Sequence, residues 1–244
     1  MPLLALPARA AEADPAAQQI ESFYSALIDA MKQGKELGLQ GRYKQFTPVT
    51  QQTFDLPGMA QMSVGPAWAT MPEPDRKAIV DAFERLTISN YAKNFSSFGG
   101  EKFTVDPNVK MRNADKIVES KLIGGDGKAT PFNYRLRMTD GKWKVVDIYL
   151  NGYVSQIALR RADYASTVAS AGAAGVQAAE NRVAAEHALD VAVVHDAGAE
   201  NRRHIHHLPK PLLEAGGKAV GIGEVRQIRV DEIVVVAEIE PGAL

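Results

Sequence analysis

The sequence predicts an α+β fold: helices come first, an antiparallel sheet of about four strands follows, and a helix closes the pattern. Three observations support this. Apolar residues recur every three or four positions over residues 15–95, which is typical of amphipathic helices. Over residues 103–149 the apolar period changes to two, as in strands of a half-buried sheet. The helical period then returns and continues to Gly172.

The first helix is expected to begin at Pro15, because Asp14 is a good N-cap and proline is tolerated in the first turn. Its pattern ends near Gly34. Its single apolar stripe consists of Ile20, Phe23, Tyr24, Leu27, Ile28 and Met31.

Residues 41–71 have a less regular helical pattern, interrupted at Pro48, Pro57-Gly58 and Gly65-Pro66. Proline inside a helix removes a hydrogen bond and clashes with the preceding turn, so we expect several short helices here. Methionine suits an adaptable apolar surface, although filling an ordinary core is its commoner use. The large apolar residues of this stretch are Phe46, Phe54, Leu56, Met59, Met62 and Trp68.

Residues 72–95 give the clearest helix, with two adjacent stripes that could contact two layers. The stripes comprise Ile79, Ala82, Phe83, Leu86 and Asn90, and beside them Val80, Thr87, Tyr91 and Phe95. Strands are expected at Phe103 and Val105, over residues 117–123, and in a hairpin. The last helix carries Val154, Ile157, Ala158, Arg161, Tyr164 and Val168.

Asp140-Gly141 is a two-residue turn of the kind that sets the register of a hairpin. The expected pairs are Thr139 with Lys142, Met138 with Trp143, Leu136 with Val145, Tyr134 with Asp147, and Phe132 with Tyr149. One face is then apolar except for Asp147. The other face carries Asn133, Arg135, Arg137, Thr139, Lys142 and Lys144, and becomes apolar only near Val146 and Ile148.

The apolar face of this sheet must be covered. Helices could cover it completely, as in an ordinary core, or partly, leaving room for an apolar ligand.

Asp147 has two interpretations. A lone buried carboxylate with a raised pKa could serve as a general base in a cavity enzyme, for example one with a nuclear-transport-factor-like or cystatin-like fold. We favour a structural carboxylate that accepts hydrogen bonds from the backbone or from Tyr134, since buried polar groups are nearly always satisfied. Histidine, the usual catalytic partner, is absent before His187. The sequence therefore predicts no catalytic residue.

The composition excludes several other classes. The 244 residues are 45% hydrophobic and 23% charged, which suits one sizeable core. A net charge of -1 with scattered basic residues does not favour nucleic-acid binding. The chain has no cysteine, which excludes disulfides and thiolate chemistry. No apolar run approaches the length needed to span a bilayer.

Residues 1–14 are similar to the end of a secretory signal peptide, with a short apolar run and small-x-small steps but no basic start. We interpret them as a signal-peptide remnant, which predicts export. A disordered alanine-rich leader is the alternative.

Three stretches resemble the MlaC family of periplasmic lipid-transport proteins: TFDLPGMAQMSVGPAW, PDRKAIVDAFERLTISNYAKNF and GKWKVVDIYLNGYVSQIALRRADYASTVASAG. The first is most similar to the hopanoid-biosynthesis-associated branch, HpnM. The resemblance covers residues 15–183. Its most specific part is the pattern formed by Trp143, Asp147, Gly152 and Ser155.

The resemblance implies a twisted antiparallel sheet and helices that enclose an apolar cavity for lipid tails. It also implies a periplasmic, monomeric carrier without a cofactor, which helps to maintain outer-membrane lipid asymmetry. The carrier would take a hopanoid or phospholipid between an inner-membrane ABC transporter complex and an outer-membrane lipoprotein complex. Such carriage is physically useful, because each exposed CH₂ opposes transfer through water by about 0.8 kcal/mol.

The expected lipid-binding residues come from both walls of that cavity. They are Phe23, Leu27, Met59, Met62, Trp68, Phe83, Leu86, Tyr91, Phe103, Phe132, Tyr134, Leu136, Met138, Trp143, Val145 and Tyr149.

Residues 184–244 lie outside the resemblance and are interpreted as a C-terminal extension of unknown structure. They include a strand-like run over residues 228–236, and Gly221-x-Gly223 lacks the third glycine of a dinucleotide loop. Short histidine-rich segments usually bind metal incidentally, so no metal site is predicted. The five histidines are His187, His195, His204, His206 and His207.

A protein adaptor that binds partners through its basic sheet face is a further alternative, with Arg135 and Arg137 as candidate contacts. Solvated charge on the outer face of a sheet is the commoner explanation.

Overall fold

The computed structural model describes the backbone of residues 13–196 and the side chains as far as residue 184. Its α+β architecture agrees with the prediction. The helices are α1 (Pro15–Lys32), α2 (Gly34–Thr53), α3 (Leu56–Val64), the 3-10 helix η1 (Gly65–Thr70), α4 (Glu73–Asn94) and α5 (Gln156–Asp196). The strands are β1 (Lys102–Val105), β2 (Lys110–Arg112), β3 (Asp115–Val118), β4 (Ser120–Ile123), β5 (Ala129–Thr139), β6 (Lys142–Leu150) and β7 (Val154–Ser155).

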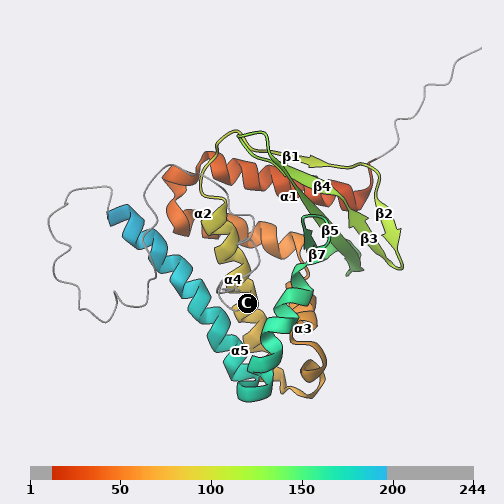
Figure 1. Ribbon diagram of the computed structural model, residues 1–244, viewed down its shortest axis with the longest axis vertical. Helices are drawn as coiled ribbons and strands as arrows, with labels where there is room; N and C mark the ends of the chain where they lie inside the picture. The colour runs from red at the N-terminus through yellow and green to blue at the C-terminus, as the bar shows by residue number, and fades with distance from the viewer. Residues whose placement is uncertain (1–12, 197–244) are drawn as a thin grey trace, which may run out of the picture.

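Helix α1 begins as expected and is fixed to the sheet at its first turn. The Asp14 carboxylate accepts a hydrogen bond from the amide of Ala16 at 2.8 Å. The same carboxylate forms an ion pair with Lys116 of β3 at 2.6 Å. The apolar stripe of α1 therefore lies against the sheet (Figure 1).

The expected break at Pro48 is wrong, because α2 continues through it and is kinked instead at Gly38, which has φ 58°. Pro48 cannot bond the carbonyl of Lys44, but both residues are exposed, so water can satisfy that carbonyl. The other two interruptions are confirmed: Pro57 lies in the first turn of α3 and Gly65 caps its end.

Strand β5 is the centre of the antiparallel sheet. One edge of β5 pairs with β4 and then with β3, and its other edge pairs with β6. The described residues form seven strands rather than about four. The strand expected at 117–123 divides at Glu119 into β3 and β4, and β2 and β7 are too short to show a period of two.

The hairpin register is confirmed near the turn and wrong beyond it. Leu136 faces Val145 as expected, but Arg135 faces Asp147, so Val146 is the extra residue of a β-bulge. Beyond the bulge, Tyr134 pairs with Ile148 and Phe132 with Leu150. The bulge takes Asp147 off the apolar face, where an ionised group would be costly to bury, and places Ile148 there instead.

Helix α5 consists of two arms that meet at Gly172, where φ is 59° and the chain reverses direction. The predicted stop at Gly172 is confirmed, but a second arm follows and runs without a break through residue 184. On the first arm the buried arginine is Arg160, whereas Arg161 is exposed.

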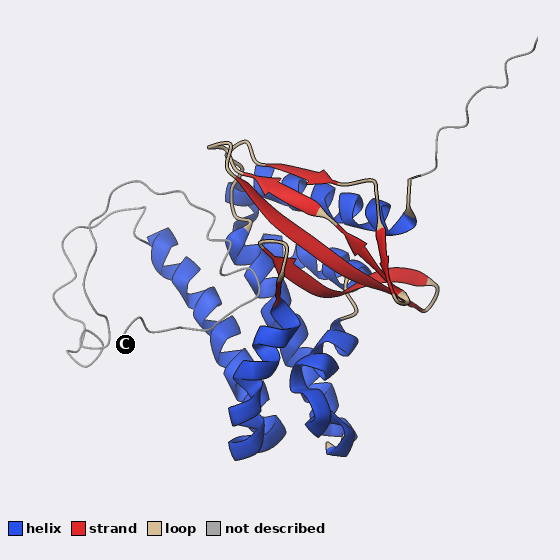
Figure 2. Ribbon diagram, turned by 45° about the vertical axis from the view of Figure 1, so that its right-hand side comes forward, coloured by secondary structure: helices blue, strands red, loops and turns tan. Residues whose placement is uncertain are grey.

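Figure 2 shows the layers: the sheet forms the upper part with helices against one face, and further helices extend below it. The lower helices are α3, α4 and the two arms of α5 (Figure 1). No helix within residues 13–196 has the length and apolarity needed to cross a membrane.

Candidate functional site

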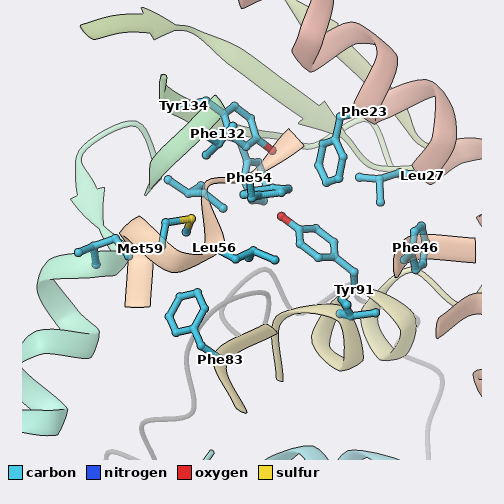
Figure 3. Close-up of a cluster of buried hydrophobic side chains, with 14 of the residues drawn as sticks. Phe23, Leu27, Phe46, Phe54, Leu56, Met59, Phe83, Tyr91, Phe132 and Tyr134 are labelled. Carbon is cyan, nitrogen blue, oxygen red and sulfur yellow. The ribbon is translucent and has the colours of Figure 1, made fainter. Parts of the chain in front are cut away.

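The main candidate site is a buried apolar cluster between the inner face of the sheet and helices α1 to α4 (Figure 3). Strand β5 contributes to one wall through Phe132, Tyr134 and Leu136, which are at most 3% exposed. Helices contribute the other wall, with Phe83 of α4 and Met59 of α3 equally buried.

Aromatic rings dominate the centre of this apolar cluster. Phe23 lies edge-on to Phe54, with ring centroids 5.1 Å apart, and edge-on to Tyr91 at 5.3 Å. Tyr91 stacks on Phe95 at 5.7 Å. Because these rings come from α1, α4 and the ends of α2 and α4, the centre depends on the mutual position of three helices.

Among the residues whose side chains are described, two buried hydroxyl groups have no hydrogen-bond partner. Tyr91 is 2% exposed and points its hydroxyl into the apolar cluster (Figure 3), and burial raises the pKa of that hydroxyl. Thr50 of α2, one turn from both Phe46 and Phe54, is fully buried and its Oγ1 is also unpartnered. By contrast, the Tyr24 hydroxyl is paired with the Ser120 hydroxyl at 2.6 Å. Buried polar atoms are rarely left unpaired, so Tyr91 and Thr50 require an explanation.

Most of the predicted lipid-binding residues meet in this cluster. Nine are buried members of it: Phe23, Leu27, Met59, Phe83, Tyr91, Phe132, Tyr134, Leu136 and Val145. Four more are partly buried against it: Met62, Trp68, Phe103 and Trp143.

Three predicted residues lie elsewhere. Met138 is 49% exposed near the tip of the hairpin. Tyr149 lies on the outer face, where its hydroxyl accepts a hydrogen bond from Arg112 at 3.2 Å, because the bulge reverses its orientation. Leu86 is buried but outside the cluster.

Several members of the cluster were not among the predicted lipid-binding residues. Phe46, Phe54 and Leu56 were recognisable as large apolar residues, and Phe95 belongs to the second stripe of α4. Ile148 was not predicted, because only the bulge places it on the inner face. The adjacent apolar pair formed by Val145 and Val146 was a signal of an irregular strand.

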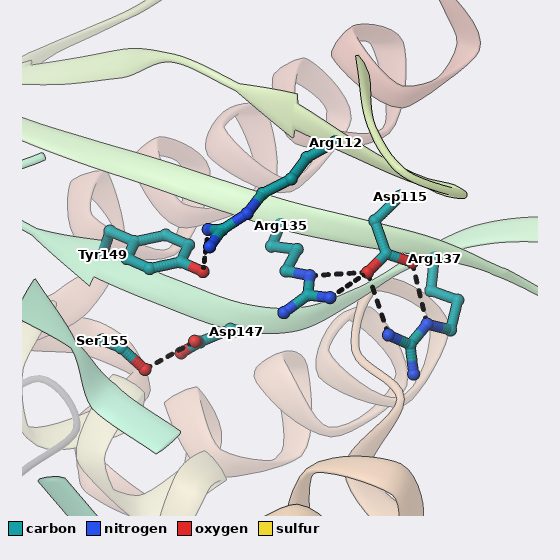
Figure 4. Close-up of polar contacts among 7 residues, drawn as sticks. All are labelled: Arg112, Asp115, Arg135, Arg137, Asp147, Tyr149 and Ser155. Atoms are coloured by element: carbon teal, nitrogen blue, oxygen red, sulfur yellow. Dashed lines mark hydrogen bonds and ion pairs between the residues drawn. The ribbon is translucent and has the colours of Figure 1, made fainter. Parts of the chain in front are cut away.

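Asp147 lies on the outer face and joins β6 to α5 (Figure 4). It accepts hydrogen bonds from the Ser155 hydroxyl at 2.6 Å and from the amides of Ile148 and Ile157. Its predicted backbone partners are confirmed, whereas Tyr134 as a partner is wrong, because Tyr134 faces the interior. Burial raises the pKa of Asp147, and these hydrogen bonds oppose that change.

Three residues of the sequence pattern, Asp147, Gly152 and Ser155, form the corner between sheet and helix, whereas Trp143 lies at the other end of β6, near the hairpin turn. Gly152 supplies a positive φ of 84° in the turn. The Ser155 hydroxyl accepts a hydrogen bond from the amide of Ala158 in the first turn of α5. Trp143 lies under the Lys116 ammonium, which is 4.5 Å from the ring centroid.

A second carboxylate, Asp115, holds two arginines on the outer face (Figure 4). It forms ion pairs with Arg135 at 2.5 Å and with Arg137 at 2.8 Å. The hydrogen bonds from Arg137 and Arg135 lower the pKa of Asp115 despite its burial. Both arginines that were considered as partner contacts are thus engaged by the protein itself.

An open cleft of about 500 Å³ lies between α3, the sheet and the first arm of α5. Arginines reach it from the sheet and from α5, and one carboxylate reaches it from the start of α3. Its lining residues are Asp55, Gly58, Gln61, Met62, Gly65, Pro66, Arg137, Val146 and Arg161.

No group of three or more His, Asp or Glu side chains that could hold a metal is found among the described residues. The histidine-rich segment, the strand-like run at 228–236 and Gly221-x-Gly223 lie outside the described residues, as do residues 1–12 of the expected leader.

The sequence profile described as "MlaC protein" matches residues 21–179, which is more than half of the chain. The chain belongs to the MlaC family. A comparison with curated proteins gave no match. Among solved structures, the fold is similar to a phospholipid-binding protein from Ralstonia solanacearum, determined in complex with a phospholipid. The two share 18% identity with a TM-score of 0.64, and the match covers 72% of this chain and 99% of that one.

In this member of the MlaC family, the corner formed by Asp147, Gly152 and Ser155 has a structural role. Every polar atom named above for it is used to connect β6, the turn and α5. Among the described residues, the apolar cluster and the cleft beside α3 are candidate ligand sites.

Proposed function

We propose that this member of the MlaC family is a periplasmic lipid carrier that takes up the acyl chains of a phospholipid between the sheet and helices α1 to α4. Membership in the family is the observation that carries the proposal. The phospholipid complex of the Ralstonia solanacearum protein supports the ligand class.

The composition of the buried cluster supports an apolar ligand. Its walls are aromatic and aliphatic, and an acyl chain placed among them gains about 0.8 kcal/mol for each CH₂ removed from water. The unpaired hydroxyls of Tyr91 and Thr50 also distinguish this interior from a finished core, in which such groups would be bonded. A carrier needs an interior that is completed by its ligand.

A hopanoid is the alternative ligand, suggested by the similarity of residues 53–68 to the HpnM branch. The carrier would act as a monomer between an inner-membrane ABC transporter complex and an outer-membrane lipoprotein complex, and so help to maintain the lipid asymmetry of the outer membrane.

The geometry of Asp147 favours carriage over catalysis. Its carboxylate is occupied by Ser155 and two backbone amides, and it lies on the outer face of the sheet, away from the apolar cluster. A general base must reach a substrate proton, and this carboxylate is directed to the corner that begins α5.

Uptake of lipid from vesicles by wild type and three tryptophan variants tests the proposal. Phe83→Trp and Leu136→Trp add bulk inside the apolar cluster and are expected to lower the lipid bound per protein by about tenfold, because the added ring occupies space that the chains require. Leu86→Trp is the matched control, since Leu86 is buried on the same helix one turn away but outside the cluster. Occupancy that is unchanged in both cluster variants, or reduced equally in the control, would contradict the proposed location.

A further inference from the structure

We propose that Tyr91 and Tyr134 hold a hydroxyl group carried by the apolar part of the lipid, so that the carrier prefers lipids with a hydroxylated hydrocarbon chain over lipids with unsubstituted chains. This inference rests on the proposed function, in which acyl chains enter the apolar cluster, and extends it to the chemistry of those chains.

The Tyr91 side chain is surrounded by aromatic rings that offer its hydroxyl no partner. Its ring centroid is 5.3 Å from that of Phe23 and 5.8 Å from that of Phe54. Tyr91 is 2% exposed, and its hydroxyl has no hydrogen-bond partner among the described residues. Because an unpaired buried hydroxyl costs free energy, a polar group that enters the cluster gains by pairing with it.

A second unpaired hydroxyl belongs to the same part of the cluster. Thr50 lies one turn from Phe46 and one turn from Phe54, and both of these rings pack around Tyr91, with centroids 6.4 and 5.8 Å away. A threonine in a helix often donates to the carbonyl one turn before it. The buried Oγ1 of Thr50 instead has no partner within the described part of the chain. Helices α2 and α4 thus each bring one unused hydroxyl to this region.

Tyr134 brings a third polar group, whose hydrogen is already in use. The Ser120 hydroxyl donates to the Phe132 carbonyl, which can only accept, so Tyr24 donates its own hydrogen to Ser120. The Tyr24 oxygen is then left as an acceptor, and the Tyr134 hydroxyl forms a hydrogen bond with it. Tyr134 therefore has lone pairs to offer a ligand but no hydrogen.

Tyr91 and Tyr134 are together complementary to a hydroxyl group placed between them. Their hydroxyls point toward one another in Figure 3 and interact electrostatically, but they do not bond to each other. A ligand hydroxyl can accept from Tyr91 and donate to Tyr134, whereas a carbonyl can only accept and a methylene can do neither. The pair therefore selects an alcohol, and the surrounding apolar side chains favour one that is part of a hydrocarbon chain.

The test is competition for uptake from mixed vesicles of three phospholipids that share one headgroup and differ in one chain, which is stearoyl, hydroxystearoyl or ketostearoyl. Separate mixtures place the oxygen near the carboxyl end, at mid-chain or near the methyl end, and bound lipid is identified by mass spectrometry. At one of these positions, wild type should take up the hydroxylated lipid about fivefold more than the stearoyl lipid, the effect of a net hydrogen bond. It should take up the ketone to an intermediate extent.

Two variants that each remove a single oxygen test the roles of the two tyrosines. Tyr91→Phe should bring the uptake of all three lipids close to equal, because both the hydroxyl and the ketone depend on its hydrogen. Tyr134→Phe should remove only the preference for the hydroxyl over the ketone. The matched control is Tyr153→Phe, which makes the same change at a side chain that is 77% exposed and should leave all ratios unchanged.

A long-chain alcohol without a headgroup, offered in the same vesicles, identifies the source of the hydroxyl. If this alcohol alone shows a preference that depends on Tyr91, the assignment to a phospholipid chain is overturned. Ketone uptake by wild type equal to hydroxyl uptake overturns the role of Tyr134 and with it the proposed selection of an alcohol.

The remaining outcomes separate the two proposals. Equal uptake of the three phospholipids by wild type at every position of the oxygen, unchanged in Tyr91→Phe, overturns the hydroxyl site and leaves lipid carriage intact. No uptake of any lipid by wild type overturns the carrier function itself.

Discussion

The outer face of the sheet and the apolar interior differ in whether their buried polar groups have partners. On the outer face, Asp115 is only 2% exposed and engages two arginines, and Asp147 accepts three hydrogen bonds. In the interior, the hydroxyls of Tyr91 and Thr50 have no partner. The completed networks connect the strands of the outer face to one another and to α5, whereas the unpaired hydroxyls of Tyr91 and Thr50 support the proposal that a ligand enters the interior.

The largest expected effect comes from breaking the completed network. Asp115→Ala leaves Arg135 and Arg137 beside each other without their shared counter-ion. Because both arginines are partly exposed, we expect a loss of about 2–3 kcal/mol in the free energy of unfolding, at the low end for a buried ion pair. Urea denaturation measures it. A loss below about 0.5 kcal/mol would show that the trio is not a structural unit.

The next largest effect is on the pH dependence of stability, to which Asp115 and Glu180 contribute with opposite signs. The lowered pKa of Asp115 gives stability that is present above its ordinary value of 3.8 and is lost as pH falls below it. Glu180, which pairs with Arg160 at 2.9 Å across the arms of α5, has its pKa raised from 4.5 to about 7 by burial. Its contribution is therefore greatest below pH 4.5 and is lost as pH rises through 7.

Glu180→Gln should remove this dependence between pH 5 and pH 8, which we expect to be about 2 kcal/mol in wild type. Unfolding by urea at the two pH values measures it, with the exposed Glu21→Gln as control. Identical pH profiles for wild type and Glu180→Gln would contradict the buried position of this carboxyl group.

The smallest expected changes in unfolding free energy come from removing the hydroxyl group of each of two buried tyrosines. Tyr24→Phe removes a hydroxyl paired with Ser120 and should cost about 1 kcal/mol in unfolding free energy. Tyr91→Phe removes an unpaired hydroxyl and should leave the stability of the lipid-free protein unchanged or raise it by about 0.5 kcal/mol. Equal losses in the two variants, measured by thermal or urea denaturation, would mean that Tyr91 has a partner in solution.

The sequence predicted the parts of this molecule that depend on local periodicity and turn chemistry. The cap at Asp14, the α4 stripes and the first three pairs of the hairpin follow from residue spacing alone, and they were confirmed. Nine of the predicted lipid-binding residues meet in one cluster for the same reason, since each lies on the apolar side of its own element.

The errors arise where tertiary context decides. A bulge at Val146 turned Tyr149 outward and Asp147 away from the apolar face, and both Val145 and Val146 are buried beside it. Pro48 does not end α2, because the carbonyl of Lys44 is at an exposed position where water can satisfy it. The cleft was not predictable at all, because Asp55, Arg137 and Arg161 are far apart in the chain and meet only in the fold.

Lipid carriage is tested by native mass spectrometry of the full chain, purified gently from the cells that make it. We expect a protein mass increased by one lipid, which is released on denaturation and identified by fragmentation as a phospholipid with two acyl chains. A protein that carries no lipid when isolated, and takes up none from phospholipid vesicles, would contradict it.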